Sequence, residues 1–362
     1  MKWDSGMNLP RTHAKVTFSE AWFNHNYGLI FGEKYCLDPI FRTEQDRDAM
    51  RLLYDRFGAL GIGEKDPKHH PHLEICGHRF ISALLGCEIS YQDDQSPAAH
   101  SITINSPKEI SAIARPCLKN NYWAQKFHSQ ADILINHYGF VDATINHGGP
   151  LNVASIVLGI ESFVFLGDCA PEMRQFLHLI ADLCSECYDQ LTLPYSPGTD
   201  PGREMFIGNC PVIMISPTTY RNEVFAADLQ IRNNTSKFGL HHCGIMDNYL
   251  ESYKQLGPCE FVEVGWGSNI DMVQEAFPDT VLDVFINICD VQYMPGTDLR
   301  EAIDGMFEQL KSTHNIRDVW VADVGPEVSD RTIADFVEAV NLSIPPTACH
   351  MSSTRAKQTI SA

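Results

Sequence analysis

The sequence predicts an α/β fold, and within that class a single (β/α)8 TIM barrel that follows an irregular N-terminal extension. From about residue 100 onward, short apolar runs with strand character alternate with amphipathic helical patterns, which is typical of a parallel sheet. The chain has 362 residues, a length that α/β barrels use for one domain. No Gly-x-Gly-x-x-Gly follows any of these runs, which disfavours an open dinucleotide-binding sheet.

The first hundred residues have a less regular pattern. They are rich in aromatic, His and Pro residues, and one helix is predicted between Thr43, an N-cap candidate, and Gly58, where it would stop. We therefore expect residues 1–100 to form an extension packed on the barrel and residues 101–362 to form the barrel, the two making one structural domain.

The strands and helices expected after residue 100 follow from periodicity and from start and stop residues. The expected strands are Val141–His147, Pro211–Ile215, Phe238–His241, Cys259–Val264, Thr280–Ile288 and Asp318–Asp323. The expected helices are Ser106–Ala114, Leu151–Leu158, Glu172–Leu191, Thr218–Ile231, Ile245–Gln255, Asn269–Phe277, Thr297–Leu310 and Ser329–Val340.

Charge and cysteine usage restrict the class of partner and the compartment. Lys and Arg number 27 against 46 Asp and Glu, a formal charge of -19, which argues against a nucleic acid or an anionic membrane as the partner. No uninterrupted apolar run reaches the roughly 18 residues of a membrane span. The 12 cysteines have no framework spacing. We expect a soluble, cytoplasmic protein with reduced thiols.

The strongest chemical signal lies at the end of one expected strand. His241 and Cys243 are two residues apart, so in extended backbone both side chains point to the same side. Glu263 lies on the next expected strand, and Cys, His and Glu are common zinc donors. Three such ligands leave one position open, as a catalytic zinc requires. The alternative is that Cys243 is a small buried hydrophobe and His241 a hydrogen-bonded core residue.

A barrel would place further polar residues beside this pair, because its functional site forms at the carboxyl ends of the strands. The polar residues at those expected ends are Asn146, His147, Ser216, Cys289, Asp290 and Asp323. The site is therefore expected to draw on several successive strands.

Two other motifs are weaker. If the chain around residue 75 is extended, one face would carry His72, Glu74, Cys76 and His78, which form a secondary candidate for a metal site. The alternative is a solvated loop that leads into a half-buried segment. Cys184 and Cys187 have redox-type spacing but lie in the middle of an expected helix. A redox pair sits at a helix N-terminus, so these two are expected to be packing residues.

The order of several motifs resembles that of the uroporphyrinogen decarboxylase superfamily. The resemblance rests on Gly149-Pro-Leu-Asn152, Ile215-Ser-Pro-x-x-Tyr220, His241-x-Cys-Gly244 and the helix after Gly296-Thr297, and it covers roughly residues 100 to 342. It implies a (β/α)8 barrel and one of two activities. These are carboxyl removal from a tetrapyrrole and zinc-dependent methyl transfer to or from a corrinoid.

The resemblance is closer to the methyltransferase branch. True decarboxylases carry an Arg-rich N-terminal run that holds substrate carboxylates, whereas the matching region here has only Arg11. His241 and Cys243 match the His-x-Cys of the methyltransferases, and Glu263 matches in kind a ligand of the related zinc site of cobalamin-independent methionine synthase.

The sequence lacks one metal ligand that the resemblance leads us to expect. A late Cys is expected where Val324 stands, so Asp323 or Cys289 would replace that ligand. In the mechanism that the resemblance implies, zinc holds an acceptor thiol as thiolate. A carboxylate ligand would make the centre harder and shift the preferred acceptor towards an oxygen or nitrogen compound.

The resemblance therefore implies a zinc-dependent methyltransferase that moves a methyl group between a corrinoid and a small acceptor. No cobalamin-binding Asp-x-His-x-x-Gly is present, so the corrinoid would arrive free or on a partner protein, and the barrels would pair as a homodimer. Two alternatives stay open: a metal-independent decarboxylase or lyase, and a non-catalytic corrinoid- or tetrapyrrole-binding barrel. The expected catalytic residues are His241, His147 and Asp290, and the expected substrate-binding residues are Asn146, Tyr220 and Trp266.

Overall fold

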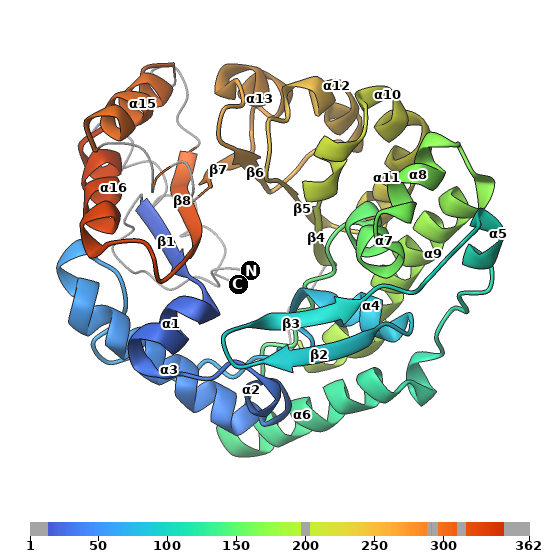
Figure 1. The fold of residues 1–362 in the computed structure, drawn as a ribbon, viewed down its shortest axis with the longest axis horizontal. Helices are drawn as coiled ribbons and strands as arrows, with labels where there is room; N and C mark the ends of the chain where they lie inside the picture. The colour runs from blue at the N-terminus through green and yellow to red at the C-terminus, as the bar shows by residue number, and fades with distance from the viewer. Residues whose placement is uncertain (1–13, 197–202, 288–290, 292–295, 310–315, 344–362) are drawn as a thin grey trace, which may run out of the picture.

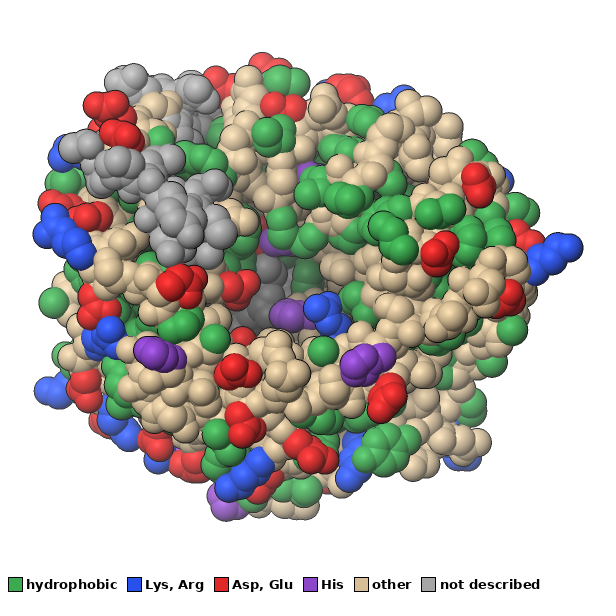
Figure 2. All heavy atoms as spheres, in the orientation of Figure 1, with side chains coloured by type: hydrophobic (Ala, Val, Ile, Leu, Met, Phe, Trp, Pro, Cys, Tyr) green, Lys and Arg blue, Asp and Glu red, His purple; other side chains and the backbone are tan. Residues whose placement is uncertain are grey.

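A computed structural model describes residues 14–196, 203–287, 291, 296–309 and 316–343. Helices form the outside of a ring and the strands of the main sheet lie on its inner side (Figure 1). The space-filling view of the same face is hollowed in the middle (Figure 2).

The main sheet has six parallel strands in the order β1-β8-β7-β6-β5-β4. Their bounds are Ala14–Phe18 (β1), Glu204–Gly208 (β4), Lys237–His242 (β5), Phe261–Gly265 (β6), Val281–Ile286 (β7) and Ile316–Val324 (β8). All described pairings within this sheet are parallel. The predicted α/β class with a parallel sheet is confirmed, and the described residues do not show a closed barrel of eight strands.

The expected strand Val141–His147 is reduced to a single bridge. His72 pairs in parallel with Asp142, and the Leu73 backbone N–H donates to the Asp142 carbonyl at 3.2 Å. Residues 143–149 form no strand, and the Thr144 N–H donates to the Asp142 carboxylate at 3.0 Å, a local contact that competes with strand pairing.

The expected strand Pro211–Ile215 is wrong. Residues Cys210–Met214 form a 3₁₀ helix that begins with a Pro in its first turn, and Ile213 and Met214 are 52% and 63% exposed. The strand lies seven residues earlier, at Glu204–Gly208, where the side chains from Met205 onward are buried. Two apolar runs lie close together here, and the first one pairs with β5.

Residues 14–100 were expected to be irregular, and this is wrong. They contribute β1, which pairs with β8, helices α1 (Glu20–Tyr27), α2 (Glu33–Leu37) and α3 (Pro39–Phe57), and a hairpin of β2 (Glu88–Gln92) and β3 (Gln95–His100). The long helix starts four residues before the expected Thr43, because the Asp38 carboxylate caps the Phe41 N–H at 3.0 Å.

The remaining helices surround the sheet and hairpin. Their bounds are Phe80–Leu84 (α4), Pro107–Ile110 (α5), Tyr122–Tyr138 (α6), Pro150–Leu158 (α7), Glu161–Gly167 (α8), Pro171–Cys187 (α9), Pro217–Thr219 (α10), Phe225–Asn233 (α11), Leu250–Tyr253 (α12), Ile270–Ala276 (α13), Gly296–Gln309 (α15) and Asp330–Ser343 (α16). Ser329 caps α16 as expected, since its hydroxyl accepts from the Thr332 N–H at 3.1 Å.

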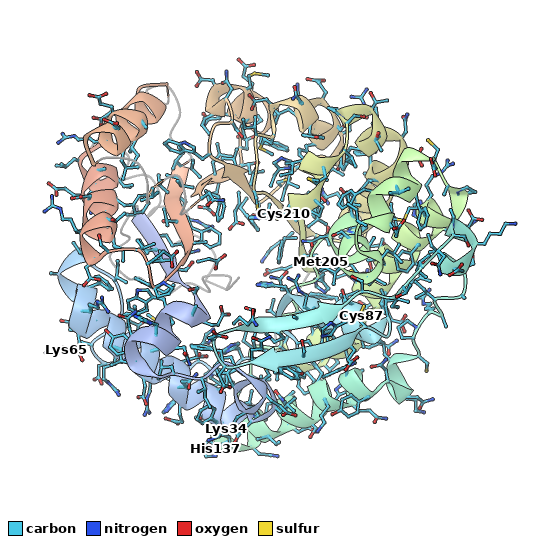
Figure 3. The ribbon with its side chains drawn as sticks, in the orientation of Figure 1. Lys34, Lys65, Cys87, His137, Met205 and Cys210 are labelled. Atoms are coloured by element: carbon cyan, nitrogen blue, oxygen red, sulfur yellow. The ribbon has the colours of Figure 1, made fainter. Side chains whose placement is uncertain are left out.

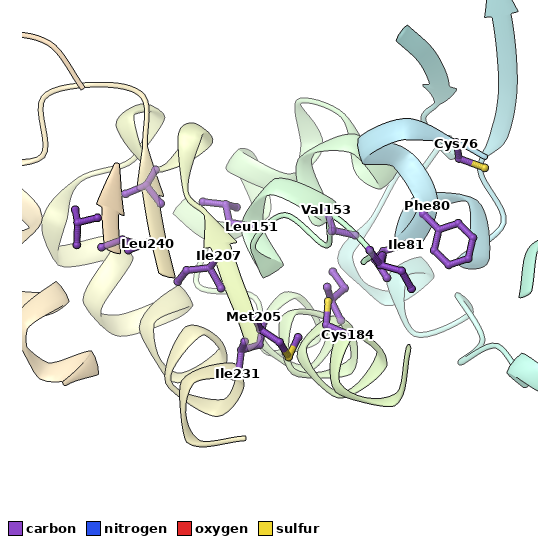
Figure 4. Packing of buried hydrophobic residues seen from close by; sticks show 14 of the residues in the cluster. Cys76, Phe80, Ile81, Leu151, Val153, Cys184, Met205, Ile207, Ile231 and Leu240 are labelled. Atoms are coloured by element: carbon purple, nitrogen blue, oxygen red, sulfur yellow. The ribbon is translucent and has the colours of Figure 1, made fainter. Parts of the chain in front are cut away.

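The core between the sheet and its helices is apolar (Figure 4). Leu151 from α7, Ile207 from β4 and Leu240 from β5 are fully buried in it. Cys184 and Cys187 of α9 belong to the same core and are also fully buried. Their predicted role as packing residues is confirmed.

No single helix in the described ranges is long and apolar enough to cross a membrane. The bent pair Pro150–Leu158 and Glu161–Gly167, with 118° between its helices, meets the length and composition criteria together.

Candidate metal centre

The ends of β4 and β5 bring two cysteines and a histidine together. Gly208 of β4 is in register with His241 of β5, and the Asn209 N–H donates to the His241 carbonyl at 2.8 Å. Cys210 follows this contact, and Cys243 is the first residue after β5. Figure 3 shows Cys210 on the inner side of the ring, beside the strands.

The three ligand atoms form a compact group. Cys210 Sγ lies 2.8 Å from Cys243 Sγ, and His241 Nε2 lies 2.8 Å from Cys243 Sγ. All three atoms are within 4.8 Å of one another, as ligands of one metal ion must be. Two sulfurs and one imidazole nitrogen make a donor set that suits zinc.

Glu263 occupies the opposite side of the imidazole. In register with His241 on β6, it places Oε2 2.6 Å from His241 Nδ1 and is buried. Because the two ring nitrogens point apart, a metal at Nε2 would not be bound by a carboxylate at Nδ1. Glu263 was expected to bind the metal directly, and its position at Nδ1 contradicts that expectation. It is placed instead to orient the histidine, as carboxylates do behind metal-bound imidazoles.

Neighbouring groups shift the pKa values of His241, Cys210 and Cys243. Burial lowers the pKa of His241, but the hydrogen bonds to Cys210 and Glu263 outweigh it and raise the pKa to about 9. The hydrogen bond from Cys243 lowers the pKa of Cys210 to about 4, against the effect of burial and with the help of His241. The same hydrogen bond raises the pKa of Cys243. The cluster therefore stabilises a thiolate.

Glycines let the surrounding backbone pack close to the cluster. A Cβ at Gly265 would overlap the carbonyls of Cys243 and Gly244, and one at Gly149 would lie 2.8 Å from the Gly208 carbonyl oxygen. These close approaches hold the ends of β4, β5 and β6 and the start of α7 together. They also explain why Gly stands at both positions.

A buried polar network lies beneath the cluster. The Asp228 carboxylate accepts from Asn209 Nδ2 at 2.8 Å and from the Tyr220 hydroxyl at 2.7 Å. Burial raises the pKa of Asp228 to about 6. His242 Nδ1 pairs with the Tyr253 hydroxyl at 3.0 Å, and burial together with the charge of His241 lowers its pKa to about 4.

Tyr220 was expected to bind substrate, and this is wrong. Its side chain is fully buried and its hydroxyl is committed to Asp228. The ring packs against Tyr253 at 5.3 Å between centroids. Tyr220 therefore supports the strand ends from below. Trp266, also expected at substrate, is half-buried and packs against the core.

Asn146 and His147 lie near the cluster without joining it. Asn146 contacts His78 and accepts from the Gly148 N–H at 3.3 Å. His147 is 3% exposed, burial lowers its pKa to about 4, and neither ring nitrogen has a partner among the described residues. The next residues of this segment reach β4, because the Gly149 N–H donates to the Gly208 carbonyl at 3.1 Å.

Of the two candidates for the missing ligand, Asp323 and Cys289, the structure describes only Asp323, which is not part of the cluster. Asp323 is exposed near the end of β8 and has a positive φ of 57°. It does not belong to the group of candidate metal ligands formed by Cys210, His241 and Cys243. Cys289 and Asp290 lie outside the described residues.

The secondary candidate His72, Glu74, Cys76 and His78 does not assemble. The segment is not extended throughout, since Gly77–Arg79 forms a 3₁₀ turn. Cys76 is fully buried, whereas His78 is exposed and contacts Asn146. Within the described ranges, the Cys210, His241 and Cys243 group is where metal-type ligands converge.

Cys210 was missed in the sequence. The expected strand at Pro211–Ile215 placed Cys210 at the wrong end of a strand, where it could not join the site. The usable signal was the buried run Met205–Gly208, which ends two residues before Cys210 and so puts it at the functional edge.

Comparison with known proteins does not assign this chain to a family. No family model matches the chain, and no curated protein sequence matches it.

Proposed function

We propose that the protein is a zinc-dependent methyltransferase that moves a methyl group between a corrinoid and a small acceptor. The observation that carries the proposal is the convergence of Cys210, His241 and Cys243 at the ends of adjacent strands, with ligand atoms within 4.8 Å of one another. Three protein ligands leave one position open for a substrate atom, as catalytic rather than structural zinc sites do.

The residues of the chain have separate parts in this proposal. Cys210, Cys243 and His241 Nε2 would hold the metal, and Glu263 would keep the imidazole in the orientation that presents Nε2. When bound, zinc would supply a Lewis acid that lowers the pKa of an incoming thiol. His147, with both ring nitrogens lacking a described partner, would position the substrate.

Two further strand positions fit a closed barrel around this site. The bridge between His72 and Asp142 is parallel, like every pairing of the main sheet. The segment after Asp142 reaches β4 through the Gly149 and Gly208 backbone. The segments around these two bridge residues would fill the interval between β1 and β4, and a barrel of eight parallel segments would result.

A methyl-transfer assay tests the proposal. Zinc-loaded protein is incubated with methylcobalamin and a set of small thiols, and the loss of methylcobalamin is followed by its absorbance. We expect turnover that stops after chelation and returns with zinc. Cys243→Ser should lose turnover, whereas the matched variant Cys117→Ser, at an exposed cysteine away from the cluster, should keep it.

The opposite results would remove the proposal. Turnover that is unchanged by chelation and by Cys243→Ser would show that the cluster has no part in it. Metal-independent removal of a carboxyl group from a small carboxylated substrate would favour the decarboxylase alternative instead.

A further inference from the structure

A separate cavity of about 120 Å³ lies at the end of β1. Its walls come from β1, α1, α2 and β3, all within the first hundred residues. In Figure 1, α1 and α2 lie across the ring from the ends of β4 and β5. None of the residues that line the cavity belongs to the Cys210, His241 and Cys243 group.

Four aromatic rings form one side of this cavity. Ring centroids are 6.1 Å apart for Phe18 and Phe23, 5.9 Å for Phe23 and Phe31, and 5.1 Å for Phe31 and Tyr35. The Tyr35 hydroxyl donates to Asp46 at 2.8 Å and is thereby occupied. The rings thus make one side of the cavity aromatic, and the face of an aromatic ring carries a negative partial charge.

Carboxylates complete the wall. Glu20 and Glu74 both line the cavity. Glu20 Oε1 accepts from the Ser96 hydroxyl at 2.5 Å, and Glu20 forms no ion pair with a Lys or Arg within the described ranges. The nearby cation Arg42 is fully buried behind Tyr35, where it donates to the carbonyls of Tyr35, Cys36 and His72. The cavity therefore has anionic and aromatic walls.

We propose that this cavity binds a methylated ammonium group and thereby selects a methylated amine as the small-molecule substrate. Aromatic faces combined with a carboxylate are the means by which proteins recognise quaternary ammonium groups, since methyl groups prevent strong hydrogen bonding and leave cation–π attraction and charge to act. An engineered cavity of about 150 Å³ holds benzene, so the present one suits a group of four or five heavy atoms. This inference rests on the proposed methyl transfer.

A methylated amine is chemically consistent with the proposed methyl transfer. Methyl transfer from a quaternary ammonium breaks one C–N bond, and the neutral amine leaves with the electron pair of that bond. The acceptor, a reduced corrinoid, supplies the lone pair of the new bond to carbon. Phe18 ends β1 as Cys210 and Cys243 follow β4 and β5, so the cavity and the cluster lie at the same edge of one parallel sheet.

Calorimetric titration tests the binding site directly. Tetramethylammonium chloride is titrated into the full-length protein beside tert-butanol, a neutral ligand of similar shape. We expect tetramethylammonium to bind at least about tenfold more tightly, because the cation–π and carboxylate contributions apply to the charged ligand alone. Equal affinity for the two ligands, or no binding of tetramethylammonium, would overturn the proposal.

A matched pair of variants locates the site. Glu20→Gln should weaken tetramethylammonium binding about tenfold and leave tert-butanol binding unchanged. Glu33→Gln removes a carboxylate at the same first-turn position of α2, outside the cavity lining, and should change neither affinity. Identical tetramethylammonium affinities for wild type and Glu20→Gln would place the ligand elsewhere and contradict the proposal.

The titration is repeated on Cys243→Ser to separate this inference from the proposed function. Unchanged tetramethylammonium binding to a variant without zinc would support the cavity independently of the metal centre. Intact zinc binding together with absent tetramethylammonium binding would overturn the amine assignment and leave the metal centre standing.

Discussion

Two cysteine pairs in this molecule have opposite environments. Cys184 and Cys187 lie on α9, fully buried among apolar side chains. Burial raises the pKa of Cys184 to about 12 and also raises that of Cys187. Cys210 and Cys243 lie at strand ends beside an imidazole, and the pKa of Cys210 falls to about 4. The two cysteines with redox-type spacing are therefore held as thiols, whereas the pair 33 residues apart stabilises a thiolate at Cys210.

The difference shows that neighbours, not spacing, decide what a cysteine does. Sulfur in an apolar core loses access to the charged form, whereas a thiolate beside a histidine is stabilised and can bind a metal. The reactive pair also rests on polar groups, with Asn209, Asp228 and His242 each holding a buried atom without a described partner. Such unpaired groups cost stability and are tolerated where function requires them.

The largest contrast should appear in alkylation. In metal-free native protein, we expect iodoacetamide to modify Cys210 roughly 100-fold faster than Cys184, because the thiolate is the nucleophile and Cys184 is protonated and buried. Zinc should protect Cys210. Peptide mass spectrometry over time measures both rates, and similar rates for the two cysteines would break the comparison.

Glu263→Gln should weaken zinc binding by about 10- to 100-fold, because the carboxylate that orients His241 is replaced by a neutral amide. The control is Glu260→Gln, an exposed position shortly before the same strand, which should bind zinc as wild type does. Competition with a fluorescent zinc chelator gives both affinities. A Glu263→Gln affinity equal to that of the control would show that the carboxylate does not support the site.

The polar network beneath the cluster should make stability depend on pH. The folded pKa of Asp228, about 6, lies above the unfolded value of about 3.9, so ionisation costs stability above pH 6. Asp228→Asn keeps one oxygen for Tyr220 and Asn209 and should stabilise the protein at pH 8 by on the order of 2 kcal/mol. The gain should shrink from pH 6 towards pH 4. Urea unfolding at pH 8, 6 and 5 measures it, and a gain that does not vary with pH would contradict the buried charge.

Cys184→Ala should have the smallest effect. Removal of one sulfur from a packed apolar site should cost about 1 kcal/mol of unfolding free energy and leave the zinc content unchanged. Urea unfolding and metal analysis of the same sample check both statements. A loss of zinc in this variant would mean that the two cysteine pairs are not independent.

Local patterns in the sequence predicted much of the fold. Strands β5 and β6 and helices α7, α9 and α16 lie within a few residues of their expected places, since each has a clear apolar period or a capping residue. The strand before Cys210 was misplaced because two apolar runs follow each other, and only pairing with β5 distinguishes them.

The candidate site was predicted in part for a similar reason. His241 and Cys243 share one strand end, so local spacing identified them. Cys210 depends on the register between β4 and β5, and the orienting position of Glu263 depends on which imidazole nitrogen it meets. The position of Tyr220 in the Ile215-Ser-Pro-x-x-Tyr220 motif suggested substrate binding, but its buried hydroxyl donates to Asp228. Such contacts arise from tertiary packing and leave no local pattern.

The most direct test of the metal centre is the zinc content of purified protein, measured by elemental mass spectrometry without chelators in the buffers. We expect about one zinc per chain in wild type and in Cys187→Ser, and a large loss in Cys210→Ser and Cys243→Ser. A metal-free wild type, or full zinc in both cluster variants, would contradict the assignment of Cys210, His241 and Cys243 as the metal ligands.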